Sequence, residues 1–538
     1  MKGGGWLAGS QFLQKARGAF YTTHTAAEYM VRWAVRSPGD LILEPCFGAG
    51  AFLGPLSEAL GPERVYGAEI DEAAYRRVLD RRLLWTDRAY LGDFLRADPG
   101  KPPFPRAFTA VVGNPPYIRL RRLPRQAVAR ALQIAAAVMG EPMSPSGSLW
   151  MPFVLQSCRF LAPGGRIAFV LPYELTYVQY AKPLWRYLKG HFGEMRCVRV
   201  HDRLFPDLSQ DVVLLLADRF GGATDVVTFE TYADLDALLD GRPDTAVDIA
   251  VDDVVAGGRP FVEALLPPAL RELLSSPRLA GRLSRLGQLS RFGIGYVAGD
   301  KRFFHLSAEQ ARAREIPPAH LQPTLTSGRE LRGIGISTRS IPRERRLYLY
   351  DPPADPEHLT AADLRYLAEG EAAGVHLRYK CRIREPWYRV PGLHRPDLLL
   401  SVFSERPVMV MNEGGFLASN SLLCGFVAPG IGPEQVVAAW YNSLTLLSCE
   451  TEVHSLGGGV LILIPGEANK VRVPRLDRVP SAYLAELDRL LRRAGGLDDA
   501  FALGDEVILQ SELELTRSEV NLIRDGVETL RRWRRNRC

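Results

Sequence analysis

The most constraining feature of the sequence is the alternation, between about residues 40 and 220, of short apolar segments with segments of helical periodicity. The strand-like segments are DLILEP, RVYGAEI, RAYLGD, FTAVVGN, GRIAFVLP, RCVRVH and DVVLLLADR. Between them, residues 25–35 and 148–162 carry apolar side chains near helical spacing. This alternation is typical of a parallel sheet with crossover helices, and it predicts a Rossmann-like α/β fold.

The last two strand-like segments are joined only by RLFPDLSQ, which is too short for a crossover helix. We therefore expect an antiparallel pair at the edge of the sheet. After about residue 225 the alternation of strand and helix patterns ends, and shorter segments rich in Gly, Pro and Arg follow. Amphipathic helical patterns begin at residue 476. The predicted organisation is an α/β domain at 1–235, a mixed α+β domain at 236–475 and a helical segment at 476–538.

Composition narrows the class of protein. With 46% hydrophobic and 24% charged residues, the chain reads as a folded globular protein. Its net charge of +6 suits a polyanionic partner. Seven scattered cysteines without a C-x-x-C pair indicate neither a disulfide framework nor a metal site, and favour a reducing cytoplasm. No stretch has the length and hydropathy of a signal peptide or membrane span, so we expect neither export nor a membrane.

A glycine-rich turn follows the first predicted strand in LILEPCFGAGAFL. Gly48 and Gly50 allow the backbone to approach a ligand, and the helix that follows offers free N–H groups. Nineteen residues after Gly50, Glu69 ends the next strand, where a carboxylate can accept from the hydroxyls of a ribose. These positions predict a nucleoside-containing cofactor at the carboxyl edge of the sheet.

The acid before the turn selects among such cofactors. Glu44 would repel a pyrophosphate but suits a ligand with an amino or sulfonium cation, which favours S-adenosylmethionine over a dinucleotide. The third strand ends near Asp93, which can accept from an adenine amino group, and Phe94 could offer a ring face for stacking.

An Asn-Pro-Pro-Tyr turn follows the fourth strand. Asn114 supplies a side-chain carbonyl and Pro115 a backbone carbonyl, so two acceptors can bind both hydrogens of one amino group. This raises the electron density on an otherwise delocalised nitrogen, which can then attack a sulfonium methyl. Tyr117 can stack on the ring that carries the amine. The turn therefore predicts methyl transfer to an aromatic amine.

With these motifs in place, the chain resembles the gamma order of amino-group DNA methyltransferases. The resemblance rests on GAFYTTHTAAEYMV, LEPCFGAGAFL and NPPY and covers about residues 15–220. It continues more loosely through LQPTLTSGRELRG and WYNSLTLLSCETEVHSLGGGVLILIP, which look like segments of TaqI-type and especially XhoI-type modification enzymes. It implies a methyltransferase domain followed by a DNA-recognition domain.

The resemblance also implies roles for further residues. Those that would surround the cofactor, with Asn114 beside it, are Tyr21, Thr22, Thr23, Glu44, Cys46, Gly48, Gly50, Glu69, Ile70, Asp93 and Phe94. Phe205 matches the family's second base-stacking aromatic and would sandwich a flipped adenine with Tyr117. The chain departs from the pattern at Cys46 and Phe47, where the family more often has small residues.

Two basic segments fit a DNA partner, because a base inside a duplex must leave the stack before it can be methylated. One lies just beyond the catalytic turn and the other in the second half, where basic and aromatic residues alternate. Their candidate phosphate contacts are Arg119, Arg121, Arg122, Arg378, Lys380 and Arg382.

The sequence therefore predicts a site-specific methyltransferase of adenine N6 in double-stranded DNA, acting as a monomer beside a cognate restriction endonuclease on a separate chain. Few residues precede the first motif, so a fused nuclease is not expected. The alternatives are methylation of another amine, such as cytosine N4, a ribosomal RNA base or a protein glutamine, and a DNA-binding relative that has lost catalysis.

Overall fold

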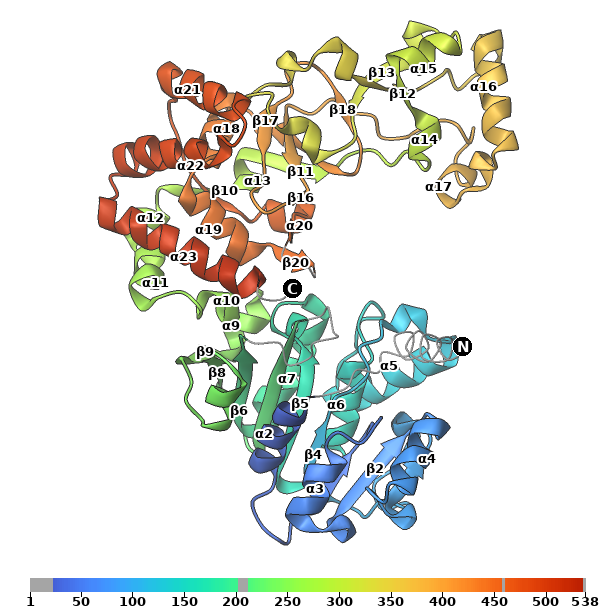
Figure 1. The fold of residues 1–538 in the computed structure, drawn as a ribbon, viewed down its shortest axis with the longest axis vertical. Coiled ribbons are helices and arrows are strands. Elements are labelled where there is room, and N and C mark those ends of the chain that lie inside the picture. Colours follow the sequence, from blue (N-terminus) through green and yellow to red (C-terminus); the bar gives the residue numbers. More distant parts are fainter. Residues whose placement is uncertain (1–22, 202–210, 457–459, 536–538) are drawn as a thin grey trace, which may run out of the picture. The chain divides into compact units, whose positions relative to one another are not determined.

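The computed structural model describes residues 23–201, 211–456 and 460–535 (Figure 1). The chain divides into two compact units, the first ending at Leu265 and the second spanning Leu266–Arg535. Among the described residues, no helix is long and apolar enough to cross a membrane.

One sheet organises the first unit. In the described residues its strands have the order β3-β2-β1-β4-β5-β7-β6-β8-β9. Their bounds are β1 Ile42–Glu44, β2 Val65–Glu69, β3 Ala89–Leu91, β4 Phe108–Gly113, β5 Leu161–Pro172, β6 Phe192–Val200, β7 Val212–Phe220, β8 Val226–Tyr232 and β9 Thr245–Ala250. Strands β1 to β5 pair in parallel, whereas β7 is antiparallel to both β5 and β6. The predicted Rossmann-like fold and antiparallel pair are confirmed.

Both faces of the sheet are buried, because successive side chains of a strand point to opposite faces. In β4, Val111 enters one hydrophobic core while Ala110 and Val112 enter the other. The helices that cover these faces are α2 His24–Ala34, α3 Leu53–Leu60, α4 Glu72–Asp80, α5 Arg125–Met139, α6 Trp150–Cys158, α7 Lys182–His191, α8 Leu235–Leu239, α9 Val251–Ala256 and α10 Pro260–Glu263. Several of these helices begin at a side-chain cap. In α4, for example, the Asp71 side chain accepts from the Ala74 N–H at 3.0 Å.

The division between the units falls after Leu265 rather than after residue 235. The reason is that β8 pairs in parallel with β6, and β9 pairs antiparallel with β8, so the sheet continues to Ala250. Phe261 of α10 then packs into the same core as Trp185. The change of rhythm near residue 225 marks two further strands of the first unit.

The second unit is a mixture of small sheets and helices. Its strands are β10 Leu283–Arg285, β11 Ser290–Ile294, β12 His305–Ser307, β13 Leu321–Leu325, β14 Leu347–Tyr350, β15 Leu398–Ser401, β16 Phe403–Ser404, β17 Met409–Met411, β18 Leu417–Ala418, β19 Leu422–Val427, β20 His454–Leu456, β21 Val460–Ile462 and β22 Arg472–Pro474. They form sheets of order β10-β22, β11-β19-β15-β17, β12-β14-β13-β18 and β16-β21-β20. This is the mixed α+β architecture expected from the sequence.

The helices of this unit include those of residues 476–535, the described part of the C-terminal segment that the sequence set apart. Their bounds are α11 Pro268–Ser275, α12 Pro277–Ala280, α13 Leu286–Leu289, α14 Lys301–Phe304, α15 Ala308–Ala313, α16 Ala361–Ala372, α17 Tyr379–Arg382, α18 Pro433–Trp440, α19 Ser443–Glu452, α20 Pro465–Ala468, α21 Ser481–Arg492, α22 Leu497–Gly504 and α23 Arg517–Arg535. Helix α23 packs against α19 and α11, so it is part of the second unit.

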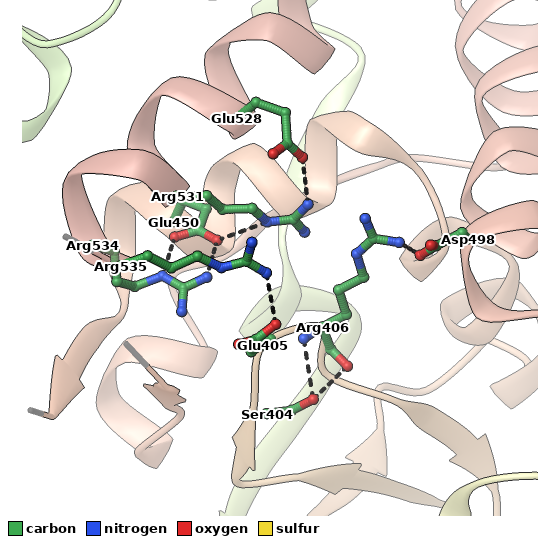
Figure 2. A network of polar contacts seen from close by, with 9 residues as sticks. All are labelled: Ser404, Glu405, Arg406, Glu450, Asp498, Glu528, Arg531, Arg534 and Arg535. Carbon is green, nitrogen blue, oxygen red and sulfur yellow. Dashed lines mark hydrogen bonds and ion pairs between the residues drawn. The ribbon is translucent and has the colours of Figure 1, made fainter. Parts of the chain in front are cut away.

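A buried ion cluster fastens α23 to α19 (Figure 2). The Glu450 carboxylate accepts from Arg534 Nε at 2.8 Å and Nη2 at 2.7 Å, and from Arg531 Nε at 3.4 Å. All three side chains are at most 4% exposed. At the rim, Arg531 also pairs with the exposed Glu528 at 2.7 Å. Glu450 therefore compensates two buried guanidinium groups on the last helix.

Replacing Glu450 by Gln should destabilise the second unit by about 3–5 kcal/mol, because two buried guanidinium groups lose the buried carboxylate that they share. The matched control is Glu528→Gln, which removes a 57% exposed partner of the same Arg531 and should cost at most about 1 kcal/mol. Urea unfolding of the two variants measures the difference. Equal, small losses in both would show that the buried cluster does not hold α23.

Candidate functional site

Three carboxylates meet at the carboxyl edge of the parallel strands. Glu44 is the last residue of β1, Glu69 is the last residue of β2, and Asp93 follows β3 by two residues. Because these strands are adjacent and parallel, their ends open onto the same edge of the sheet.

The glycine turn lies directly above this edge. Gly48 and Gly50 have φ of +52° and +82°, a region that favours glycine. A Cβ at Gly48 would meet no atom within 4 Å, whereas one at Gly50 would meet Leu83 at 3.1 Å. Gly48 therefore faces open space and Gly50 packs inward. Phe47 is 2% exposed and turned into the core, so this departure from the family pattern leaves the turn open.

Glu69 is held by the backbone around it. Its Oε2 accepts from the Gly48 N–H at 2.8 Å, and its Oε1 accepts from the N–H groups of Ile70 and Asp71, each at 2.8 Å. A carboxylate oxygen has two lone pairs, so Oε2 keeps one further acceptor position. Beside it, Ile70 is 69% exposed. The arrangement suits a ligand that brings a hydroxyl and an apolar face.

Glu44 is a buried acid that lacks a hydrogen-bonding partner on one oxygen. It is 2% exposed, and its Oε2 has no hydrogen bond. Burial and the negative charge of Glu69 raise its pKa well above the usual range. An unsatisfied buried carboxylate is costly unless a cation or donor reaches it. The carboxylate acceptors around the glycine turn thus fit a ligand with a positive charge and hydroxyl groups.

Phe94 differs from the sequence interpretation, whereas the role of Asp93 stays a prediction. Asp93 Oδ1 accepts from the Leu95 N–H at 3.0 Å, and Oδ2 lies 3.7 Å from Arg96 Nε. Phe94 is only 2% exposed, with its ring against Phe153 and Phe160. It supports the strand end from within the core and does not present the open stacking face that its position in the sequence suggested.

The Asn-Pro-Pro-Tyr turn begins where β4 ends and touches the glycine turn. A Cβ at Gly113 would meet Pro45 at 3.1 Å, so the two segments approach closely. The Cys46 thiol donates to the backbone carbonyl of Asn114 at 3.2 Å. Burial and the charges of Glu44 and Glu69 raise the pKa of this thiol, which keeps it protonated as a donor. Asn114 is half-buried and Pro115 is buried.

The other end of the Asn-Pro-Pro-Tyr turn is also fixed. Tyr117 is half-buried and its hydroxyl donates to the Val170 carbonyl in β5 at 2.9 Å, while burial raises its pKa. Arg119 pairs with Glu174 at 2.6 Å, and Glu174 also accepts from the Tyr180 hydroxyl at 2.5 Å. The turn is therefore preorganised at its start, at its tyrosine and at its exit.

These contacts identify positioning residues that the sequence does not reveal. Glu174 lies 55 residues after its partner Arg119, and no local pattern connects them. The Ile118 carbonyl accepts from the Leu149 N–H at 2.8 Å and from the Ser148 hydroxyl at 3.1 Å. In the sequence, the only signal for them was their position: Glu174 comes just after strand β5, and Ser148 and Leu149 come directly before helix α6.

The remaining predicted site residues divide into two groups. Tyr21, Thr22 and Phe205 lie outside the described residues. Thr23 accepts from the Ala26 N–H at 3.4 Å and so caps helix α2.

The six predicted phosphate contacts also differ among themselves. Arg121 and Arg122 are exposed, whereas Arg119 is paired as described. In the second unit, Lys380 and Arg382 are exposed, but Arg378 pairs with the buried Asp300 at 2.6 Å. Throughout the described ranges, no group of His, Cys, Asp and Glu side chains could hold a metal ion.

Family models match both units. Residues 101–202, which include the Asn-Pro-Pro-Tyr turn, match the Eco57I restriction-modification methylase model. Residues 258–509 match the C-terminal domain of Type II methyltransferase M.Eco57I. The second match falls almost wholly within the second unit.

Curated relatives cover most of the chain. Type II methyltransferase M.XhoI of Xanthomonas vasicola is 34% identical over 440 residues, which cover 77% of this chain and 75% of the relative. Type II methyltransferase M.XamI of Xanthomonas campestris pv. amaranthicola is 25% identical over 485 residues, 86% of each.

Solved structures support the fold. The Type IIL restriction-modification enzyme MmeI in complex with DNA has a TM-score of 0.53 at 11% identity, over 95% of this chain and 75% of that one. The DrdV-DNA complex gives 0.52 at 11% identity, over 90% and 58%. The fold agrees with these matches, and the match to M.XhoI covers three quarters of both chains. This chain therefore belongs to the Type II DNA methyltransferases of restriction-modification systems.

Proposed function

We propose that the protein transfers a methyl group from S-adenosylmethionine to N6 of an adenine flipped out of double-stranded DNA. The observation that carries this proposal is the 3.2 Å contact between Cys46 and the carbonyl of Asn114. It joins a turn suited to a cationic nucleoside ligand to a turn suited to an aromatic amine.

The cofactor assignment rests on the carboxylate acceptors and the open backbone at the glycine turn. Glu44 would face the positive charge of the methionine end, the open backbone at Gly48 would admit the ligand, and the remaining acceptor position of Glu69 would take a ribose hydroxyl. Ile70 would cover the adenine. When bound, S-adenosylmethionine supplies a methyl group on a positively charged sulfur, which is the electrophile of the reaction.

The catalytic turn would prepare the amine. The side-chain carbonyl of Asn114 and the backbone carbonyl of Pro115 would each accept one N–H of the amino group, which draws electron density onto the nitrogen. No strong base is required, because this nitrogen becomes acidic only as the new bond forms. Tyr117, whose hydroxyl is tied to β5, would stack on the base.

Adenine is favoured over cytosine because family members that methylate cytosine more often begin this motif with serine. DNA contact is supported by the exposed Arg121 and Arg122 just beyond the turn. Since Arg119 is already paired with Glu174, we assign it to positioning the turn and not to phosphate. We further propose a cytoplasmic monomer that protects DNA from an endonuclease on a separate chain.

The target base is tested by incubating the chain with labelled S-adenosylmethionine and a varied pool of duplex DNA, followed by nucleoside chromatography. We expect label in N6-methyladenine. Replacing Asn114 by Ala should lower kcat by about 100-fold or more, as expected for loss of one transition-state contact, with cofactor affinity nearly unchanged. Label in N4-methylcytosine, or in none of the nucleosides, would contradict the assignment.

The pH dependence of cofactor binding tests Glu44. A cation stabilises the ionised carboxylate, so binding should release protons at a pH near the raised pKa of Glu44, and affinity should fall as the pH drops through it. Calorimetry in buffers of different ionisation enthalpy measures this release. Glu44→Gln should abolish it, whereas the control Glu72→Gln, on an acid 61% exposed in α4, should not. Unchanged proton release in Glu44→Gln would disprove the role.

The contact between the two turns is tested at Cys46. Because neither proline offers an N–H, the Asn114 peptide plane is held through its carbonyl. Loss of one hydrogen bond of about 1 kcal/mol in Cys46→Ala should therefore lower kcat by about 5-fold. Cys46→Ser keeps a donor and should retain most activity. Single-turnover rates and cofactor titrations separate the effects. A kcat equal to wild type in Cys46→Ala would show that the thiol does not position the turn.

A further inference from the structure

The segment around helix α17 exposes apolar side chains among cations. Leu377, Tyr379 and Ile383 are 67%, 62% and 60% exposed, although large apolar residues are normally buried. Lys380 Nζ and Arg382 Cζ each lie 5.5 Å from the Tyr379 ring centroid. Figure 1 shows α17 at the end of the second unit that carries α14 and α16, away from α21 and α23.

This surface is firmly supported from beneath. Arg378 pairs with the 5% exposed Asp300 at 2.6 Å. Arg384 donates to the backbone carbonyls of Ala298 and Val297, at 2.8 and 2.5 Å. Cys381 is fully buried between these two anchors. Two of the arginines in this basic run therefore hold the segment, and the exposure of its apolar side chains is built into the fold.

The basic residues of this segment have two different roles. Arg378 and Arg384 have intramolecular acceptors, whereas Lys380 and Arg382 extend into solvent beside Tyr379. From His376 to Arg384 the segment contains no acid. Positive charge around an apolar projection is complementary to nucleic acid, whose phosphates flank the sugars and the stacked faces of its bases. Lysine is depleted at protein–protein interfaces, so Lys380 favours nucleic acid as the partner.

We propose that the segment 377–383 is a wedge that enters a groove of duplex DNA. Tyr379, with Leu377 and Ile383 beside it, contacts base edges and sugars, and Lys380 and Arg382 pair with the flanking phosphates. Because DNA is the substrate in the proposed function, the inference rests on that proposal and adds residues that touch the bases. These residues contribute to sequence preference, since only base contacts can do so directly.

The wedge is tested by fluorescence anisotropy of the full chain with a labelled duplex oligonucleotide at graded salt concentrations. Tyr379→Ala should weaken binding by about 10-fold with the salt dependence unchanged, as for loss of an apolar base contact. Tyr379→Phe should bind as wild type. Lys380→Ala should weaken binding and reduce the salt slope by about 1, as expected for one phosphate contact.

The matched control is Trp85→Ala in the first unit. Trp85 is 44% exposed and has the Arg88 guanidinium 5.5 Å from its ring, so it reproduces the exposed aromatic and cation without the anchored wedge. We expect its DNA binding to equal that of wild type. Failure of the wild-type chain to bind duplex DNA would contradict the proposed function itself.

A wild-type chain that binds DNA while Tyr379→Ala binds it equally well would overturn the wedge alone. Loss of self-association in Tyr379→Ala, seen by sedimentation with DNA affinity intact, would also overturn it and assign the surface to a second copy of the chain.

Discussion

The parallel pairing of β1 with β4 is the interaction on which the site depends. The register Ile42↔Ala110 and Leu43↔Val111 brings two strand ends, nearly 70 residues apart in the chain, to the same edge of the sheet. Because the strands run in the same direction, Glu44 and Gly113 open onto that edge together. Without this pairing, nothing would bring the glycine turn and the Asn-Pro-Pro-Tyr turn into contact.

Burial of two carboxyl groups, Glu44 and Glu69, at the same edge is electrostatically unfavourable. Glu44 and Glu69 are both largely buried and raise the pKa of Cys46, and Glu69 raises that of Glu44. Glu69 is compensated by three backbone N–H groups, but Glu44 keeps an oxygen without a partner. Two apolar cores, one on each face of the sheet, hold the strands in place around this unfavourable cluster. A buried acid at a strand end with a perturbed pKa is typical of a functional site.

The parts of the fold that are encoded locally could be predicted from the sequence. Strand segments, the antiparallel pairing of β6 with β7, the glycine turn and the acids at strand ends all follow from patterns within a few residues. The partners of arginines could not, because Arg119 and Arg378 find Glu174 and Asp300 only through the tertiary fold. The burial of Phe94 could not be predicted for a similar reason, since it depends on Phe153 and Phe160. Strands β8 and β9 were missed because they follow a change in local composition.

We propose that the ends of β1, β2 and β4 form one site, with the cofactor and the target amine side by side. A crystal structure of the chain with S-adenosylhomocysteine and a duplex that it methylates would show both ligands. We expect the cofactor over Gly48, its ribose hydroxyl on Glu69, and the flipped base with its amino group between Asn114 and Pro115. A cofactor bound away from this edge, or a base whose amino group does not reach Asn114, would contradict this proposal.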